Sequence, residues 1–287
     1  MSQANTTTKT KTLIFGGLVL AIVLSALALF QQNATGKKID RLAEIAEQQS
    51  KMLNSNTSQA DIEQMMAAQI AAFEREKQLR QYKSVSPAYS NAQERLESED
   101  LIYGNPDAEF SVIEFSDFDC PYCKSYHETP KKVVDQAGGD VNWVWKHFPV
   151  HPSARSLHEA TSCIAKVAGN KEFWTASQLV FDNGGSNGIK PGELADLMPI
   201  DRKAFDACMA SGEMKSKVEE DYKFGQQAGV SGTPASSVIH HKTGEVYTLS
   251  GAVPEGQLQA AITQLRKKAA AAESVEGDNI EEVALTQ

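Results

Sequence analysis

The sequence has no surplus of basic residues: 28 Lys and Arg side chains stand against 37 Asp and Glu, which gives a formal net charge of -9. Binding to phosphate groups requires clustered Lys and Arg. The composition therefore excludes nucleic acid as a main partner. The 287 residues are 41% hydrophobic and 23% charged, an ordinary globular composition that predicts one sizeable domain with appendages.

Cysteine is scarce, with 4 in the whole chain. Cys120 and Cys123 form a Cys-x-x-Cys pair, whereas Cys163 and Cys208 stand alone. A structural zinc site usually takes four ligands, from a second such pair or from closely spaced histidines, and the sequence offers neither. We therefore expect no metal site and no diffusible cofactor. An even number of cysteines in an oxidising compartment suggests two pairs.

Charge is absent from residues 13–30, an apolar run that follows Lys9 and Lys11. Its length is close to the ~20 residues that cross a bilayer as a helix, so we interpret it as a transmembrane anchor, with residues 1–12 on the cytoplasmic side. The triplet Ala26-Leu27-Ala28 also resembles a signal-peptide cleavage site, while the lack of a polar face disfavours a buried core helix. Anchor and signal both predict export, either to the periplasmic side of the inner membrane or into the periplasm after cleavage.

Glycine and proline are absent from residues 37–82. Apolar residues recur at helical spacing on both sides of a break at 54–61, which predicts two helices in a stalk over residues 31–83. This apolar stripe has no core of its own, so it favours association of copies into a homo-oligomer; a solvated spacer is the alternative. The turn-forming residues that follow predict a linker over 84–100.

The apolar patterns after this linker predict an α/β domain over residues 101–268. The expected order is a strand, a helix from 121 to 136, a strand from 140 to 148, a long helical region, a hairpin of two strands around Gly244, and a final helix. The tail at 269–287 is acidic and lacks aromatic residues, so we expect it to be disordered.

The Cys-x-x-Cys pair falls at a strand-to-helix junction. Cys120 then lies at a helix amino terminus, where unpaired backbone N–H groups stabilise a thiolate and lower the pKa of the thiol. Cys123, one turn later, is placed to close a disulfide with it, and Pro121 suits the first helical position. A purely structural disulfide is disfavoured because closing so short a loop gains little. The pattern therefore favours redox chemistry.

Four stretches together resemble the DsbA-like branch of the thioredoxin superfamily, the periplasmic thiol-disulfide oxidoreductases. They are VIEFSDFDCPYC at 112–123, HPSA at 151–154, FDACMASGEMKSKVEEDYKFGQQ at 205–227 and GVSGTPASSVI at 229–239. The resemblance covers about residues 101–268. It implies a thioredoxin fold with a helical insertion at about 150–227.

The resemblance also implies roles for individual residues. Thr233 and a cis Pro234 would lie against the reactive cysteines, where exposed backbone groups pair with an extended substrate peptide. Pro121 and Tyr122 would border the same substrate. Glu114 occupies the position of a buried acid beneath the disulfide and would relay protons to or from Cys123; a solvated glutamate is the alternative.

The remaining candidates are structural. Cys163 and Cys208 both fall in the helical insertion, and we expect a disulfide that joins two of its helices, with buried free thiols as the alternative. His127 follows Cys123 on the same predicted helix, and we expect it on the surface.

These features predict an exported thiol-disulfide oxidoreductase that forms, isomerises or reduces disulfides in other proteins. Its expected substrates are unfolded or misfolded exported proteins, and a membrane redox partner of the DsbB or DsbD type would reset the cysteine pair. The alternative is a thioredoxin-like module that binds copper through Cys120 and Cys123, or holds unfolded proteins, without redox turnover.

Overall fold

The computed structural model describes residues 59–92 and 100–284. The predicted cytoplasmic segment 1–12, the apolar segment 13–30 and the first stalk helix lie outside this range. Within it, no helix combines the length and apolar character needed to span a membrane.

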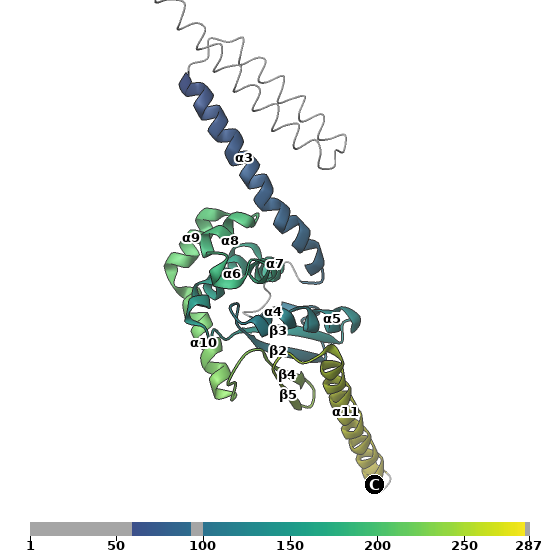
Figure 1. The fold of residues 1–287 in the computed structure, drawn as a ribbon. Coiled ribbons are helices and arrows are strands. Elements are labelled where there is room, and N and C mark those ends of the chain that lie inside the picture. Colours follow the sequence, from purple (N-terminus) through teal and green to yellow (C-terminus); the bar gives the residue numbers. More distant parts are fainter. Residues whose placement is uncertain (1–58, 93–99, 285–287) are drawn as a thin grey trace, which may run out of the picture. The chain divides into compact units, whose positions relative to one another are not determined.

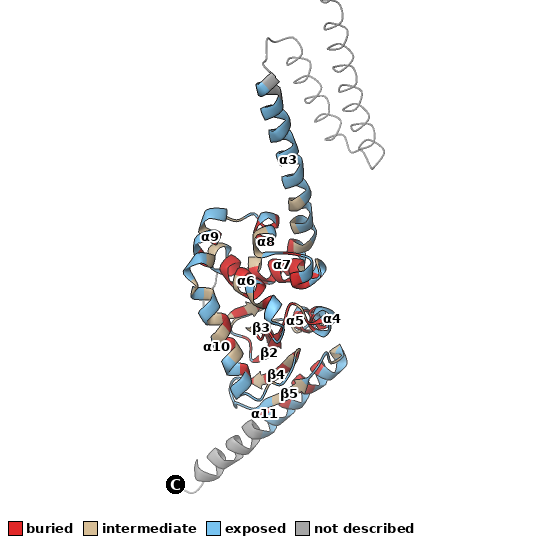
Figure 2. Cartoon of the chain, turned by 60° about the vertical axis from the view of Figure 1, so that its left-hand side comes forward, coloured by how far each residue is buried: buried red, intermediate tan, exposed pale blue. Residues whose placement is uncertain are grey.

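A long helix, α3, spans Gln59–Val85, where the sequence predicts the second stalk helix. Most of its side chains are exposed (Figure 2). They include four large apolar ones, Met65, Met66, Ile70 and Phe73.

The segment after α3 belongs to the folded domain. It forms a short 3-10 helix, η1, over Ser86–Tyr89, and the Tyr89 side chain is completely buried. Its hydroxyl donates to Gln178 at 2.8 Å, and the Tyr82 hydroxyl donates to Glu172 at 2.9 Å. Ala92 then pairs with Tyr103 in an isolated bridge. The predicted linker over 84–100 is therefore wrong for residues 86–92, because one aromatic side chain ties them to the core.

Five strands form a single mixed sheet in the order β1-β3-β2-β4-β5. Figure 1 labels β3, β2, β4 and β5 of this sheet. They are β1 (Leu101–Tyr103), β2 (Phe110–Ser116), β3 (Val141–His147), β4 (Ala235–His240) and β5 (Val246–Ser250). β2 and β3 run parallel, and the other pairs are antiparallel. In this register Ser116 pairs with His147, and Phe115 pairs with Ala235. The carboxyl ends of β2 and β3 and the amino end of β4 therefore meet at one edge.

Helices α4 (Pro121–Tyr126) and α5 (Glu128–Gln136) follow β2. The sequence predicts one helix over this range, but the structure breaks it at His127. Pro130 explains the break, because proline has no N–H to donate to the carbonyl of Tyr126 and its ring crowds that carbonyl. α5 packs against β3 and against the final helix, α11, which also packs on β4.

The predicted helical insertion lies between β3 and β4. It contains η2 (Pro152–Ala154), α6 (Arg155–Ala168), α7 (Asn170–Asp182), η3 (Gly185–Asn187), α8 (Pro191–Leu197), α9 (Arg202–Ser211) and α10 (Glu213–Gln227). α10 packs on β3 and α7 packs on β1. The largest fully buried side chains include Trp143 and Trp145 from β3 and Trp174 from α7, so the insertion and the sheet share one core.

The last helix, α11, spans Glu255–Ala284. The predicted disorder of residues 269–287 is therefore wrong up to residue 284, where the chain is helical. Residues 269–272 are four consecutive alanines, and alanine has the highest helix propensity of all residues. This local preference outweighs the acidic composition that suggested disorder.

Candidate active site

The reactive pair lies where β2 leads into α4. Cys120 is the residue that caps α4, in an extended conformation, and Pro121 holds the first helical position. The carbonyl of Cys120 accepts from the backbone N–H of Lys124 at 3.1 Å. The backbone N–H of Asp117 donates to the Cys123 sulfur at 3.4 Å. Both cysteines are free thiols, and the junction places them as the sequence predicts.

Thr233 and Pro234 lie immediately before β4, and the peptide bond between them is cis. The Cys120 thiol donates to the Thr233 carbonyl at 3.3 Å. These residues lie 113 positions apart in the chain, and the antiparallel pairing of β2 with β4 brings them together. The arrangement implied by the family resemblance is thus present in the geometry.

The surroundings of Cys120 favour its thiolate. A hydrogen bond from the Cys123 thiol is the largest cause that lowers the pKa of Cys120. Burial opposes this shift, while the Thr233 side chain and the backbone N–H groups of Cys123 and Tyr122 lower the pKa further, to about 5. A thiol of this pKa is almost entirely ionised at neutral pH, and the thiolate is the nucleophilic form.

Cys123 has the opposite character. It is completely buried, and burial raises the pKa of its thiol far above the ordinary value. The hydrogen bond to Cys120 and the nearby Glu114 carboxylate raise it further. The Cys120 sulfur is therefore the nucleophile of the pair, whereas the Cys123 sulfur keeps its proton.

Glu114 lies on β2 with no exposed surface. Burial raises the pKa of its carboxyl group to about 8, although Ser116 and Trp143 lie near enough to lower it in part. Among the described residues, no donor is positioned to hydrogen-bond either carboxylate oxygen. The alternative of a solvated glutamate is thus ruled out, and a buried acid lies beside Cys123, where it raises the pKa of that thiol.

A groove of about 260 Å³ lies next to the reactive pair. Its lining includes Phe115, Thr248, Ser250, Gly251 and residues 228–237, so Thr233 and Pro234 form part of its wall. Pro121 and Tyr122 face solvent beside Cys120, and 67% of Tyr122 is exposed. Neither cysteine lines the groove, and the Thr233 carbonyl that accepts from Cys120 connects the groove to the cysteine pair.

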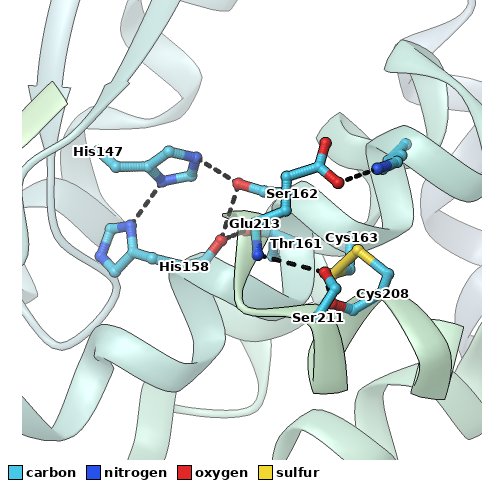
Figure 3. Close-up of a disulfide and its surroundings, with 9 residues drawn as sticks. His147, His158, Thr161, Ser162, Cys163, Cys208, Ser211 and Glu213 are labelled. Carbon is cyan, nitrogen blue, oxygen red and sulfur yellow. Dashed lines mark hydrogen bonds and ion pairs between the residues drawn. A yellow bond between two sulfur atoms is a disulfide. The ribbon is translucent and has the colours of Figure 1, made fainter. Parts of the chain in front are cut away.

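A buried set of histidines was missed by the sequence analysis. Nδ1 of His147 accepts from the Trp145 indole at 3.1 Å and lies 2.7 Å from Nδ1 of His158. His147 must therefore carry its proton on Nε2, which donates to Ser162 at 2.8 Å. Ser162 in turn donates to the carbonyl of His158 at 2.9 Å (Figure 3).

His158 is neutral for the same reason. Its Nδ1 carries the proton that it shares with His147, and its Nε2 accepts from the backbone N–H of Phe118 at 3.4 Å. Burial lowers the pKa of both rings. His147 ends β3 and His158 lies within α6, and single histidines at such positions in the sequence do not show that they meet.

His127 is also buried, which corrects the expectation of a surface position. Its side chain is 1% exposed and lies among aromatic rings that include Trp143, Trp174 and Phe181. Burial lowers the pKa of His127 to about 3. The break between α4 and α5 turns this residue inward, and the rings that cover it come from strands and helices distant in sequence.

Cys163 on α6 and Cys208 on α9 are joined by a disulfide, with an S–S distance of 2.02 Å (Figure 3). Both are buried. The structure thus contains the predicted cross-link of two insertion helices and not the alternative pair of buried thiols. Among the residues that the structure describes, no group of three or more His, Cys, Asp or Glu side chains is arranged to hold a metal ion.

A model of the thioredoxin family matches residues 96–273, more than half of the chain. The chain belongs to this family. The solved structure of DsbA2 from Pseudomonas aeruginosa superposes with a TM-score of 0.52 at 28% identity and covers 59% of this chain and 96% of that one. A thioredoxin-like oxidoreductase from Silicibacter pomeroyi superposes with a TM-score of 0.50 at 21% identity, covering 60% of this chain and 94% of that one, which supports the fold alone. The chain is thus a DsbA-like member of the thioredoxin superfamily.

Curated relatives include the Na(+)/H(+) antiporter NhaA 1 of Salinispora arenicola and NhaA 3 of Salinispora tropica. Each is 29% identical over 164 residues, which are 54% of this chain and 24% of the relative. The chain spans about a quarter of the length of these proteins. The antiporter activity in their names is that of the whole relatives.

Proposed function

We propose that this protein is a thiol-disulfide oxidoreductase that acts on exported proteins. One observation carries the proposal: the Cys120 sulfur, whose surroundings lower the pKa of its thiol to about 5, lies beside the buried Cys123 thiol and 3.3 Å from the Thr233 carbonyl oxygen. This combination supplies a nucleophile, a resolving thiol and a docking surface in one place. The similarity to DsbA2 of Pseudomonas aeruginosa supports the same activity.

In the oxidising direction, a substrate thiolate attacks the sulfur of Cys120 in the Cys120–Cys123 disulfide. A mixed disulfide forms between Cys120 and the substrate, and the bond to Cys123 breaks. A second substrate thiolate then attacks the substrate sulfur of this mixed disulfide and releases Cys120 as a thiolate. The substrate loses two electrons and gains a disulfide, and the cysteine pair gains those electrons.

Glu114 would supply the proton in the first step. Cys123 leaves as a thiolate in a buried site, where burial strongly favours the protonated thiol. A carboxyl group with its pKa raised to about 8 is protonated at neutral pH and can donate to that sulfur. In the reverse direction the same carboxylate would accept the proton from Cys123.

The stabilised thiolate favours oxidation of substrates over reduction. A low thiol pKa stabilises the reduced pair relative to its disulfide, so the disulfide becomes a strong oxidant. We therefore propose that the protein forms disulfides in unfolded proteins that lie along the groove at Thr233 and Pro234. Isomerisation or reduction would require a partner that keeps the pair reduced.

The remaining parts of the proposal concern the setting of this reaction. A membrane redox partner of the DsbB type, or of the DsbD type for a reductive role, would reset the pair. Residues 13–30 would attach the chain to the inner membrane, with the catalytic domain in the periplasm. The exposed apolar side chains Met66, Ile70 and Phe73 of α3 would join copies into an oligomer.

Two replacements test the activity. In Cys120→Ser the nucleophile is lost, so oxidation of a reduced, unfolded protein should fall to the uncatalysed rate. In Cys123→Ser the Cys120 thiolate can still attack a disulfide of an oxidised protein, but no second thiol is present to release that protein, so a mixed disulfide on Cys120 should accumulate and appear as an increase in mass. Retained turnover in Cys120→Ser would refute the proposal. If the reduced protein instead bound stoichiometric copper(I) and showed no turnover, the metal-binding alternative would hold.

A further inference from the structure

Asp117 is a buried charge close to both reactive cysteines. Its carboxylate has no exposed surface, its backbone N–H donates to the Cys123 sulfur, and its carbonyl accepts from the Cys120 N–H at 3.1 Å. Burial raises the pKa of Asp117, but the backbone N–H groups of Asp119 and His151 donate to its carboxylate, and the pKa is lowered overall. An anion therefore lies beneath the site at neutral pH. Without a positive partner it would oppose a thiolate on Cys120.

Two histidines are close to this carboxylate. Nε2 of His158 lies 3.9 Å from Oδ1 of Asp117, but the hydrogen bonds to His147 and Phe118 keep this ring neutral. Nδ1 of His151 lies 2.8 Å from Oδ2 of Asp117, and the His151 backbone N–H donates to the same oxygen at 2.8 Å. His151 is thus the histidine that can carry the compensating charge.

The fold holds His151 next to the cysteines. β2 and β3 run parallel, and the backbone N–H of Phe148 donates to the Ser116 carbonyl at 2.9 Å, so the loops that leave these strands lie side by side. The His151 side chain is 48% exposed and can exchange protons with water. The titratable groups that face it are Asp117, Cys120 and Asp119, and all three raise its pKa.

We propose that His151, held by Asp117, is a positioning residue that carries a positive charge beside Cys120 and makes the oxidising strength of the site depend on pH. This inference rests on the proposed function. A protonated His151 stabilises the Cys120 thiolate, and through it the reduced pair. When His151 loses its proton, the Asp117 carboxylate is left without its positive partner and the reduced pair is less stable.

The test uses the full-length protein equilibrated with glutathione at pH 6 and pH 9. An opposite charge near a titrating group typically shifts its pKa by about one unit or more. His151→Gln should therefore move the equilibrium at pH 6 about fivefold towards the disulfide, and it should match the wild type within about twofold at pH 9, where His151 is neutral. His151→Lys keeps the charge, so at pH 9 it should lie about tenfold further towards the dithiol than the wild type.

His241→Gln is the matched control. His241 is an exposed histidine that contacts Ser111 at the opposite end of β4 from Pro234, so its replacement should change neither equilibrium. A second readout is the ultraviolet absorbance of the thiolate, whose midpoint should rise by about one pH unit in His151→Gln.

The outcomes separate this inference from the proposed function. Equal shifts at pH 6 and pH 9 in His151→Gln would reveal a purely structural role and overturn the inference, as would no shift at pH 6. If the wild type itself did not equilibrate with glutathione, the proposed function would fail. The thiolate absorbance would still decide whether His151 acts on Cys120.

Discussion

Cys120 and Cys123 lie three residues apart at the start of a helix, whereas Cys163 and Cys208 join two helices across 45 residues. The first pair meets backbone N–H groups, a cis Thr233–Pro234 bond and a groove. The second pair is buried among helices of the insertion. The comparison shows that two cysteine pairs of one chain lie in very different environments, and the environment of a thiol sets its reactivity.

The largest expected difference is in reduction by glutathione. At pH 7, lowering the pKa of Cys120 to about 5 favours the reduced pair by about 100-fold over an ordinary thiol pair, or about 60 mV. Cys163 and Cys208 lie within α6 and α9 and not at a helix amino terminus, and their disulfide closes a long loop. A glutathione buffer that reduces the first pair fully should leave the second intact, as judged by alkylation and mass measurement. Simultaneous alkylation of all four cysteines would contradict the comparison.

Removal of the structural disulfide should cost stability and spare the chemistry. Replacement of both Cys163 and Cys208 by Ala releases a loop of 45 residues, for which the chain-entropy model gives a loss of about 4 kcal/mol in the free energy of unfolding. Guanidinium denaturation measures this loss. The same double replacement at Cys120 and Cys123 opens a far shorter loop and should lower stability much less. If the Cys163 and Cys208 replacements left the unfolding midpoint unchanged, the disulfide would have no structural role.

Replacement of Glu114 should have a smaller effect on the free energy of unfolding, and this effect depends on pH. Burial raises the pKa of this carboxyl group from 4.5 to about 8, so its protonated form stabilises the folded state. That stabilisation is complete below pH 4.5 and is lost as pH rises towards 8. In the oxidised protein, Glu114→Gln should therefore flatten the decline in stability between about pH 5 and pH 8.

The oxidation state matters for this measurement because Cys120 acts with the opposite sign. The pKa of Cys120 is lowered from 9.0 to about 5, so in the reduced protein the Cys120 thiolate stabilises the folded state. This stabilisation is complete above pH 9 and is lost as pH falls through 5. Denaturation of the oxidised wild type and Glu114→Gln at both pH values isolates the carboxyl group. Parallel pH profiles for the two proteins would show that Glu114 is not the group responsible.

The main elements of the site could be predicted from the sequence because each is a short motif with a recognisable local pattern, and the family resemblance indicated which motifs come together. The strand before Cys120 and the Gly-Thr-Pro segment each have a clear pattern, and the resemblance to DsbA-like proteins indicated that they meet. The α/β sheet and the helical insertion followed from the same apolar patterns. Local propensity and a recognisable motif pointed to the same structure at these positions.

The errors concern residues whose environment depends on distant segments. His127 was expected on the surface, but Trp143 and Trp174 cover it. Tyr89 was assigned to a linker, although its hydroxyl reaches Gln178 on α7. The contact of His147 with His158 depends on how α6 packs against the end of β3, and the spacing of single residues along the chain does not specify such packing.

The anchoring of Tyr82 and Tyr89 to α7 has a consequence for the motion of the chain that precedes the sheet. Because both hydroxyls bind the insertion, residues 71–85 of α3 belong to the same compact unit as the sheet and the cysteine pair. This end of α3 therefore moves together with the cysteine pair and not independently of it.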